Sequence, residues 1–448
     1  MILGSQTTTT LTLFSLISIV ILSVVYFFLI TEKVNKVIVA ILGAVTLIFL
    51  QVFRTAEQSS QEGAFWFINK NLDILGFVLG MMVLIGIVKE SGFFEAMAIW
   101  LVKKVKGQPA ALLIVFGYLT LLMTIFFSNI PTILILTPVL IVLIRELKLP
   151  YMPYFFIMIT MANIGGATTP ISDPTTYYQA KTVGLGFLEV VKNSGSMVFV
   201  LSIVSSFYTY FVFRKDLKKV TVSPKDVSAF DPKSAIQNKR ILKLGLPLLF
   251  LTIALMVLKD TIRRKTGITL ENATITIAAS FLGILLFHKE PNMIFKKIVD
   301  WEILAFFSGL FVIVGALEST HVIEKLSEIL LVLTGGDLRS LIVYISMGSG
   351  LLSTFIDNVP YNITMVSAIQ EMAQKGIYVY PLWWALNLGT SIGGAGSPIA
   401  AACNVLAFSQ AGREGFHVRF VKYLLIAFPL VVINTAIVST ILTLTYIK

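Results

Sequence analysis

The stretch "STFIDNVPYNIT", residues 353–364, interrupts an apolar run with a charge, two amides and a proline. Residues 341–356 are typical of one hydrophobic helix, and Asp357 stands where that helix would continue. Backbone N–H and C=O groups must be paired inside hydrocarbon, so irregular backbone at that depth has to line a cavity or be covered by protein. The stretch therefore indicates a broken membrane helix that serves a polar site.

The composition of the whole chain agrees with a membrane protein. Of its 448 residues, 56% are hydrophobic and 13% are charged, whereas a soluble domain has about 25% charged residues. Apolar stretches near the length that crosses a bilayer as helix recur along the chain. The N-terminal "MILGSQTTTT" lacks the basic region of a signal peptide, so 11–31 is expected to be a retained span. The basic pI near 9.5 fits cytoplasmic loops rather than nucleic-acid binding.

The chain repeats itself at an offset of 228 or 229 positions. "NLDILGFVLGMMVLIGIVKE" from Asn71 matches "DWEILAFFSGLFVIVGALES" from Asp300. "FFSNIP" at 126–131 matches "FIDNVP" at 355–360, and "IGGATTPI" at 164–171 matches "IGGAGSPI" at 392–399. A shared offset across three matches indicates two structural repeats.

The predicted fold is an all-α polytopic membrane protein built from two inverted repeats. Its parts are repeat one (1–213) with a hairpin at 110–148 and a broken helix at 153–183, a basic linker at 214–240, and repeat two (241–448) with a hairpin at 338–375 and a broken helix at 381–411. Short amphipathic arms are expected at 93–106 and 322–334. If the hairpins are re-entrant, each half crosses five times, which gives about ten crossings and inverts one repeat relative to the other.

The basic residues predict the orientation in the membrane. About two thirds of the 35 lysines and arginines fall on segments that are inside when the 214–240 linker is cytoplasmic. The expected protein therefore lies in the plasma or inner membrane with both termini outside. The loop 259–270, which carries four basic residues on the predicted outside, disagrees with this orientation.

The four helix breaks place polar residues at equivalent points of the two repeats. Pro131 and Pro360 each follow an asparagine by two positions, which suits a helix start with that asparagine at or near the cap. Discontinuous helices in both halves of a transporter are the best sequence pointer to its binding site. The candidate substrate- or ion-binding residues are Ser128, Asn129, Asn163, Gly165, Thr168, Thr169 and Asp173 in repeat one, and Asp357, Asn358, Asn362, Ser391, Gly393, Ser397 and Asn404 in repeat two.

Two carboxylates break the symmetry of this candidate site. Asp357 stands opposite Ser128 in the repeat alignment, and Asp173 stands opposite Ala401. Intramembrane carboxylates are costly and indicate function, so both are candidates to bind the coupling ion, H⁺ or Na⁺. Asp173, before Pro174, could instead only cap a helix, whereas Asn358 could cap the other helix without help from Asp357.

Other groups at the site supplement the two carboxylates. Carbonyls freed near Gly165-Gly166 and Gly393-Gly394 could coordinate a cation, and no lysine or arginine is expected among the site residues. The three histidines are scattered, so neither a metal site nor a cofactor is expected.

These motifs resemble the ion-transporter superfamily that joins arsenite permeases, one type of sodium–proton antiporter, the pink-eyed-dilution permease and divalent-anion/sodium symporters. "DNVPYNITM" at 357–365 resembles that superfamily's second hairpin tip, and "NIGGATTPISDPTT" at 163–176 and "LWWALNLGTSIGGAGSPIAAACNV" at 382–405 resemble its broken helices. Ser128 departs from the aspartate common in the pigmentation branch, and Thr175-Thr176 depart from Pro-Asn. The resemblance implies a scaffold, two moving units, an elevator motion and a homodimer.

The leading functional hypothesis is proton-coupled efflux of arsenite or a related small metalloid or anion, because amides and hydroxyls suit a neutral hydroxide. A sodium–proton antiporter, with both aspartates as ion ligands, is the alternative, and a sodium-coupled dicarboxylate symporter is a further one. A membrane enzyme is not expected, because no catalytic cluster or phosphate loop is present in the sequence. The expected partners are the small solute and the lipid bilayer, with no nucleic acid.

Overall fold

The computed structural model describes residues 13–31, 34–54, 59–220, 222 and 231–447. Within these ranges the chain is helical and has no strand. The predicted all-α class is confirmed. Part of the 214–240 linker lies outside the described residues.

The helices fall into two matching series. Repeat one comprises α1 (Leu13–Thr31), α2 (Lys36–Phe49), α3 (Ser60–Lys70), α4 (Leu72–Lys89), α5 (Phe93–Lys104), α6 (Pro109–Phe127), α7 (Asn129–Glu146), α8 (Tyr151–Gly166), α9 (Pro174–Val183), α10 (Phe187–Val190), the π-helix η1 (Val191–Gly195) and α11 (Ser196–Lys218). Repeat two comprises α13 (Lys239–Thr266), α14 (Asn272–Leu286), α15 (Pro291–Lys297), α16 (Trp301–Ser319), α17 (Val322–Thr334), α18 (Leu338–Ser353), α19 (Asn358–Gln374), α20 (Tyr380–Gly394), α21 (Ala402–Arg413) and α22 (Phe420–Tyr446). Helices α4 to α8 correspond in order to α16 to α20.

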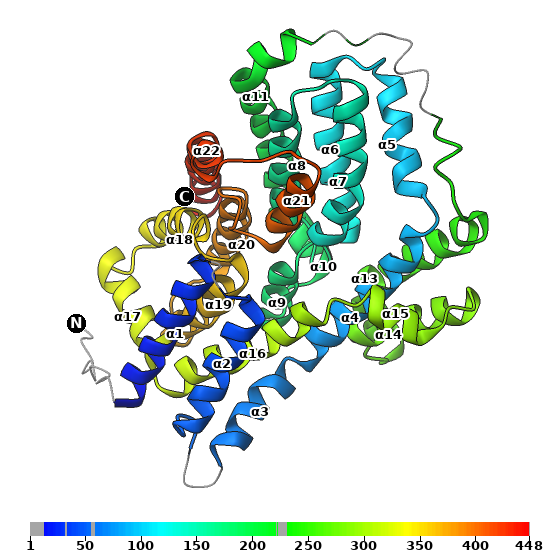
Figure 1. Ribbon diagram of the computed structural model, residues 1–448. Helices are drawn as coiled ribbons and strands as arrows, with labels where there is room; N and C mark the ends of the chain where they lie inside the picture. The colour runs from blue at the N-terminus through cyan, green and yellow to red at the C-terminus, as the bar shows by residue number, and fades with distance from the viewer. Residues whose placement is uncertain (1–12, 32–33, 55–58, 221, 223–230, 448) are drawn as a thin grey trace.

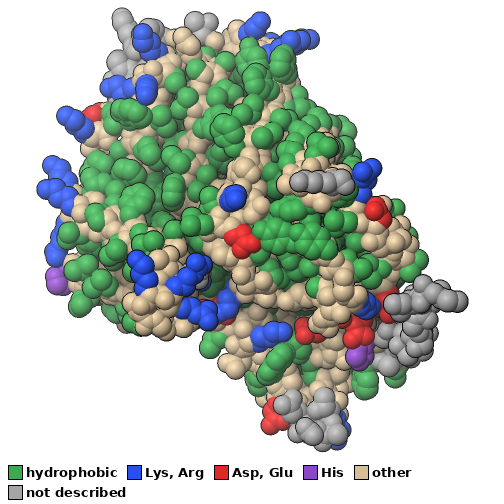
Figure 2. Space-filling model, turned by 180° about the vertical axis from the view of Figure 1, so that it is seen from behind, with side chains coloured by type: hydrophobic (Ala, Val, Ile, Leu, Met, Phe, Trp, Pro, Cys, Tyr) green, Lys and Arg blue, Asp and Glu red, His purple; other side chains and the backbone are tan. Residues whose placement is uncertain are grey.

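The length and composition of these helices fit a multi-pass membrane protein. Among the described residues, seven helices are long and apolar enough to cross a bilayer, or eight if α17 and α18, bent by 118°, count as one span. Three further apolar helices, α1, α2 and α14, are shorter. Figure 2 shows a broad hydrophobic surface, with lysine and arginine side chains gathered along its upper and left edges.

The two repeats interlock through a shared scaffold. We call α1–α4 with α13–α16 the scaffold, α6–α9 unit one and α18–α21 unit two. In the scaffold, α2 of repeat one packs on α16 of repeat two, and α4 packs on α14. The units exchange contacts in the same way, since α7 packs on α21 and α9 on α19. In Figure 1, α2, α3, α16 and α4 run along the lower side of the molecule and unit one stands above them.

Each unit begins with a helical hairpin whose two ends lie at the same end of the unit. In unit one, the Tyr154 hydroxyl near the start of α8 donates to the Pro109 carbonyl at the start of α6, at 2.8 Å. Helix α7 ends at Glu146, just before α8 begins at Tyr151. In unit two, α18 packs along α20, and Ser353 Oγ donates to the Thr390 carbonyl at 3.2 Å. Both predicted hairpin segments are thus pairs of helices, and their re-entrant placement stays a prediction.

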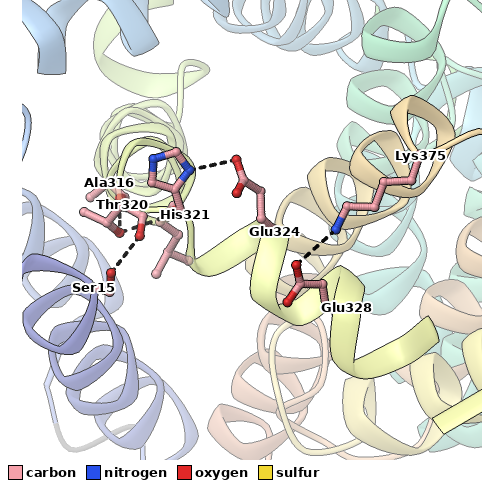
Figure 3. A network of polar contacts seen from close by, with 8 residues as sticks. Ser15, Ala316, Thr320, His321, Glu324, Glu328 and Lys375 are labelled. Carbon is pink, nitrogen blue, oxygen red and sulfur yellow. Dashed lines mark hydrogen bonds and ion pairs between the residues drawn. The ribbon is translucent and has the colours of Figure 1, made fainter. Parts of the chain in front are cut away.

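The arm α17 connects the scaffold to unit two. Figure 3 shows the corner between α16 and α17, where Ser15 of α1 donates to the Thr320 carbonyl at 2.7 Å. Farther along the arm, Lys375 at the end of α19 makes an ion pair with Glu328 at 3.5 Å. The arm therefore contacts a scaffold helix at one end and the far end of the unit-two hairpin at the other.

We expect the linker face of the protein to be cytoplasmic. The linker residue Gln237 donates its backbone N–H to the Ser91 carbonyl at 3.0 Å, which places the linker beside the end of α4. A cysteine placed at exposed Ser234, in a chain whose Cys403 is replaced by serine, should react with an impermeant maleimide only after the cells are opened. Labelling of intact cells would reverse the orientation.

Candidate functional site

The starts of four helices meet at one small cavity of about 30 Å³. Its walls from units one and two are Asn129, Ile130, Asp173, Pro174, Asp357, Asn358, Val359, Ala401, Ala402 and Cys403, and its scaffold walls are Lys36, Ile303, Phe306 and Phe307. Free N–H groups at helix starts carry partial positive charge. A polar cavity needs about 10–15 Å³ to hold one water, so this cavity has room for a water molecule or a small ion.

The two hairpin tips join the broken helices in the same way. The backbone N–H of Asn129 donates to the Ser172 carbonyl at 3.1 Å, and that of Asn358 donates to the Ala400 carbonyl at 3.3 Å. The N-cap residues are Ser128 and Asp357, one position before the asparagines. The expectation that Asn358 caps the helix and leaves Asp357 without a capping role is therefore corrected, because Asp357 is itself the cap.

Asp173 is fully engaged by donors from its own unit. Its carboxylate accepts the Thr175 N–H at 2.8 Å and the Thr175 hydroxyl at 2.6 Å, and it accepts the Asn129 side-chain amide. Asp173 is 3% exposed and caps α9. These bonds link the tip of hairpin one to the broken helix, so Asp173 has a structural task.

Asp357 has a different environment. It accepts the Val359 N–H at 3.1 Å as the cap of α19, and it lines the cavity together with Lys36 of the scaffold. The Lys36 ammonium also lies 5.2 Å from the centroid of the Phe306 ring. The expectation of a site without lysine is therefore wrong. In the sequence, Lys36 stands at the start of an apolar stretch and is typical of an interfacial residue.

A second layer of polar contacts joins the broken helices across the repeats. Asn163 of α8 donates to the Asn404 side chain of α21 at 2.8 Å, and Thr176 of α9 donates to the Asn387 side chain of α20 at 2.8 Å. Asn404 also donates to the Gly394 carbonyl at 2.6 Å. Asn387 was missed by the sequence analysis, and Thr176, which stands at the position equivalent to Asn404, entered it only as a departure from the family motif.

The carbonyls expected to coordinate a cation already accept hydrogen bonds from the protein. Gly166 accepts the Ser172 and Thr176 hydroxyls at 2.7 and 2.8 Å. Gly165 accepts the Thr168 N–H at 3.1 Å, and Gly393 accepts the Gly396 N–H at 2.8 Å. The helices α8 and α20 end at the second glycine of each pair, so the breaks follow the glycines instead of containing them.

The other candidate residues lie around the cavity and not on its walls. Thr169 donates to the Ile125 carbonyl of hairpin one at 2.9 Å, and Asn362 donates to Gln179 at 3.4 Å. The hydroxyls of Thr168, Ser391 and Ser397 are buried and have no partner among the described residues. These three hydroxyls are therefore free to donate hydrogen bonds to a ligand or a water near the cavity.

A vestibule of about 310 Å³ adjoins the cavity. The two spaces share Ile130, Pro174 and Ile303 as walls. Ser128 lies on the vestibule wall, which is otherwise mostly apolar, and Lys89, Glu90, Lys297 and Asp300 supply its charged residues. Because Lys89 and Glu90 end α4 beside the linker, the vestibule approaches the cavity from the linker side.

The repeat-equivalent vestibule is nearly closed. Phe311, Val314, Gly315 and Ile363 line a space of about 30 Å³, and they are 229 positions from Met82, Ile85, Gly86 and Leu134 of the open vestibule. Tyr178 and Phe67 also line the smaller space. The structure is thus asymmetric in access, although its two repeats are built alike.

The chain is similar to transport proteins over nearly its whole length. The family model described as citrate transporter matches residues 26–389 and 333–448. A 46 kDa membrane protein of Mycobacterium leprae is 28% identical over 440 residues, which cover 97% of this chain and 99% of that protein. An uncharacterized transporter of Synechocystis is 24% identical over 430 residues, which cover 91% of this chain and 92% of the relative.

Two further similarities are to a mammalian protein and to a solved structure. The P protein of Mus musculus is 24% identical over 496 residues, which cover 94% of this chain and 59% of the P protein. The predicted resemblance to the pink-eyed-dilution branch is thereby confirmed. The crystal structure of the Alcanivorax borkumensis YdaH transporter matches with a TM-score of 0.59 over 98% of this chain and 99% of that one, at 13% identity. That match shows a shared fold.

Proposed function

The chain belongs to the citrate transporter family (CitMHS), and from this membership we propose a substrate and a coupling ion. The substrate is a small oxygen-rich anion, such as a carboxylate, and its transport is coupled to a proton that binds Asp357. The coarser description, a multi-pass secondary transporter and not an enzyme, follows from the family and from the related transporters. The observation that carries the finer proposal is the shared cavity of Lys36, Asp357 and four helix starts.

The electrostatics of the cavity favour an anionic substrate, and because its volume is only about 30 Å³, units one and two must separate to admit a carboxylate. Lys36 supplies a full positive charge, and the starts of α7, α9, α19 and α21 supply partial ones. Protonation of Asp357 removes one negative charge from the cavity wall and leaves there the carboxyl group of Asp173, which three donors already bind, so an oxyanion is then repelled less. Oxyanions bind well at helix N-termini. Arsenite, the leading substrate by sequence, is a neutral hydroxide and gains less from Lys36, so it becomes the second candidate, supported by the amides and hydroxyls nearby.

Sodium–proton antiport is less well supported by the geometry. A sodium ion needs several oxygen ligands that are not already occupied. Asp173 is bound by three donors, and the glycine carbonyls near the breaks accept hydrogen bonds from the chain. Asp357 is then the principal carboxylate left to serve an ion, and Lys36 opposes the binding of a cation beside it.

The pseudo-symmetry of the two vestibules supports an alternating-access mechanism. One is open at about 310 Å³ and its counterpart has about 30 Å³. A movement of units one and two against the scaffold that closes the first and opens the second would present the same cavity to the other side. This elevator-type exchange needs no new fold, because the two repeats already supply both sets of walls.

Flux into proteoliposomes tests this function. With an imposed pH gradient, we expect labelled citrate or succinate to accumulate, and we expect a protonophore to abolish the accumulation. Protein-free liposomes are the control. Gradient-driven arsenite flux without carboxylate flux would support the second candidate. Gradient-driven sodium flux alone would establish the antiporter instead and would overturn the proposal.

A further inference from the structure

Lys36 occupies a position that helix stability does not explain. It is the first residue of α2, where a positive charge meets the positive end of the helix dipole and is unfavourable. The first turn of α2 holds no acidic residue. Its neighbour Asn35, the cap of α2, donates to Glu302 of α16 at 3.2 Å. Among the described residues, Lys36 makes no direct ion pair, so its favourable contacts are the Phe306 ring and the cavity.

The charge of Lys36 and the charge of Asp357 break the repeat symmetry together. Asn272, the first residue of α14, is the counterpart of Lys36 at the start of α2. Ser128, the cap of α7, is the counterpart of Asp357 at the start of α19. The starts of α2 and α19 therefore carry a lysine and an aspartate, whereas the equivalent starts of α14 and α7 carry two neutral residues.

The two charges belong to parts of the protein that would move relative to each other. Lys36 is on the scaffold, and Asp357 is at the hairpin tip of unit two. The cavity that they share has room for a water or small ion between them, and Lys36 acts electrostatically on Asp357. The other titratable groups that act on Asp357 or share its cavity are Asp173 of unit one, Cys403 of α21 and Tyr26 of α1. Lys36 is the only cation among them in the described chain.

We propose, resting on the coupled transport proposed above, that Lys36 is a fixed counter-ion on the scaffold that holds unit two, when it is unloaded, in the conformation seen here. A proton on Asp357 cancels the attraction and releases the unit. Lys36 is thus a positioning residue that acts through Asp357. Through this pair, the charge of Asp357 determines which of the two vestibules is open.

Thiol accessibility in the vestibule measures this hold without any need for transport. Met82 of α4 lines the open vestibule and is not on the cavity wall. In a chain carrying Cys403→Ser and Met82→Cys, we expect a maleimide to react quickly at pH 8. Lys36→Gln should slow the reaction by about fivefold or more, which is typical of a coupling between two sites. Lys36→Arg should restore the rate, and Lys103→Gln, at an exposed position on α5, should leave it unchanged.

A double-mutant cycle distinguishes the interaction between Lys36 and Asp357 from independent effects of the two substitutions. Asp357→Asn should slow the labelling as Lys36→Gln does, and the double variant should be no slower than either single one. Labelling of Lys36→Gln at the reference rate, failure of Lys36→Arg to restore the rate, or independent effects of the two substitutions would each overturn the proposal. If this pattern holds while the proteoliposomes show no gradient-driven flux, the pairing stands and the proposed function fails.

Discussion

Asp357→Asn should abolish transport driven by a pH gradient and leave the protein folded. Asparagine keeps the size of the side chain, and its carbonyl oxygen can still accept the Val359 N–H that caps α19. It cannot bind or release a proton, so the loaded and unloaded forms of unit two become the same in charge. Uptake of labelled citrate or succinate into proteoliposomes under a pH gradient measures the loss.

The matched control for this prediction is Asp173→Asn. Asp173 accepts three hydrogen bonds inside unit one, so its neutralisation should weaken the contact to Asn129 and reduce transport less. Size-exclusion chromatography of both variants verifies that they fold. If Asp357→Asn transports at the wild-type rate and Asp173→Asn does not, the roles of the two aspartates are the reverse of those proposed. If both transport normally, the coupling proton binds elsewhere.

The positions of the helix breaks could be predicted from the sequence, because unpaired backbone groups in a membrane helix cost free energy. A polar break survives only where it is covered, so "FFSNIP" and "FIDNVP" mark the hairpin tips, and each glycine pair marks the end of a half-helix. The short helices α3 and α15 were not predicted. Ser59 and Glu62 form a capping box at the start of α3, and Pro291 begins α15. Both signals are present in the sequence, in loops that the span analysis passed over.

The candidate site was less predictable, because its walls come from both repeats and from the scaffold. Asn129, Asp173, Asp357 and Asn358 reach the cavity from the helix breaks, where polarity in an apolar segment reveals them. Lys36 does not stand out in this way, since a lysine at the edge of a span is ordinary. Thr176 and Asn387 are neutral and bond across the repeats, and a contact between residues 211 positions apart has no local signature.

Gly393→Ala should destabilise unit two by forcing apart the helices that carry its tip. A Cβ on Gly393 would lie 2.5 Å from the Gly350 carbonyl oxygen and 2.7 Å from Ser353 Cβ, so the clash is with the backbone of α18 and cannot be relieved by rotating a side chain. Overpacking of this kind costs about 1–3 kcal/mol. We expect a lower thermal unfolding temperature in detergent, and we also expect impaired transport, because α18 ends just before Asp357.

Gly348→Ala is the control, since it adds the same methyl group to α18, the helix that Gly393 of α20 packs against, at a place with no atom within 4 Å of the new Cβ. It should leave the unfolding temperature unchanged or raise it slightly, because alanine has the higher helix propensity. An equal effect of the two substitutions would show that α18 and α20 can separate at little cost. In that case unit two would not be the rigid body that a transport mechanism with a moving Asp357 requires.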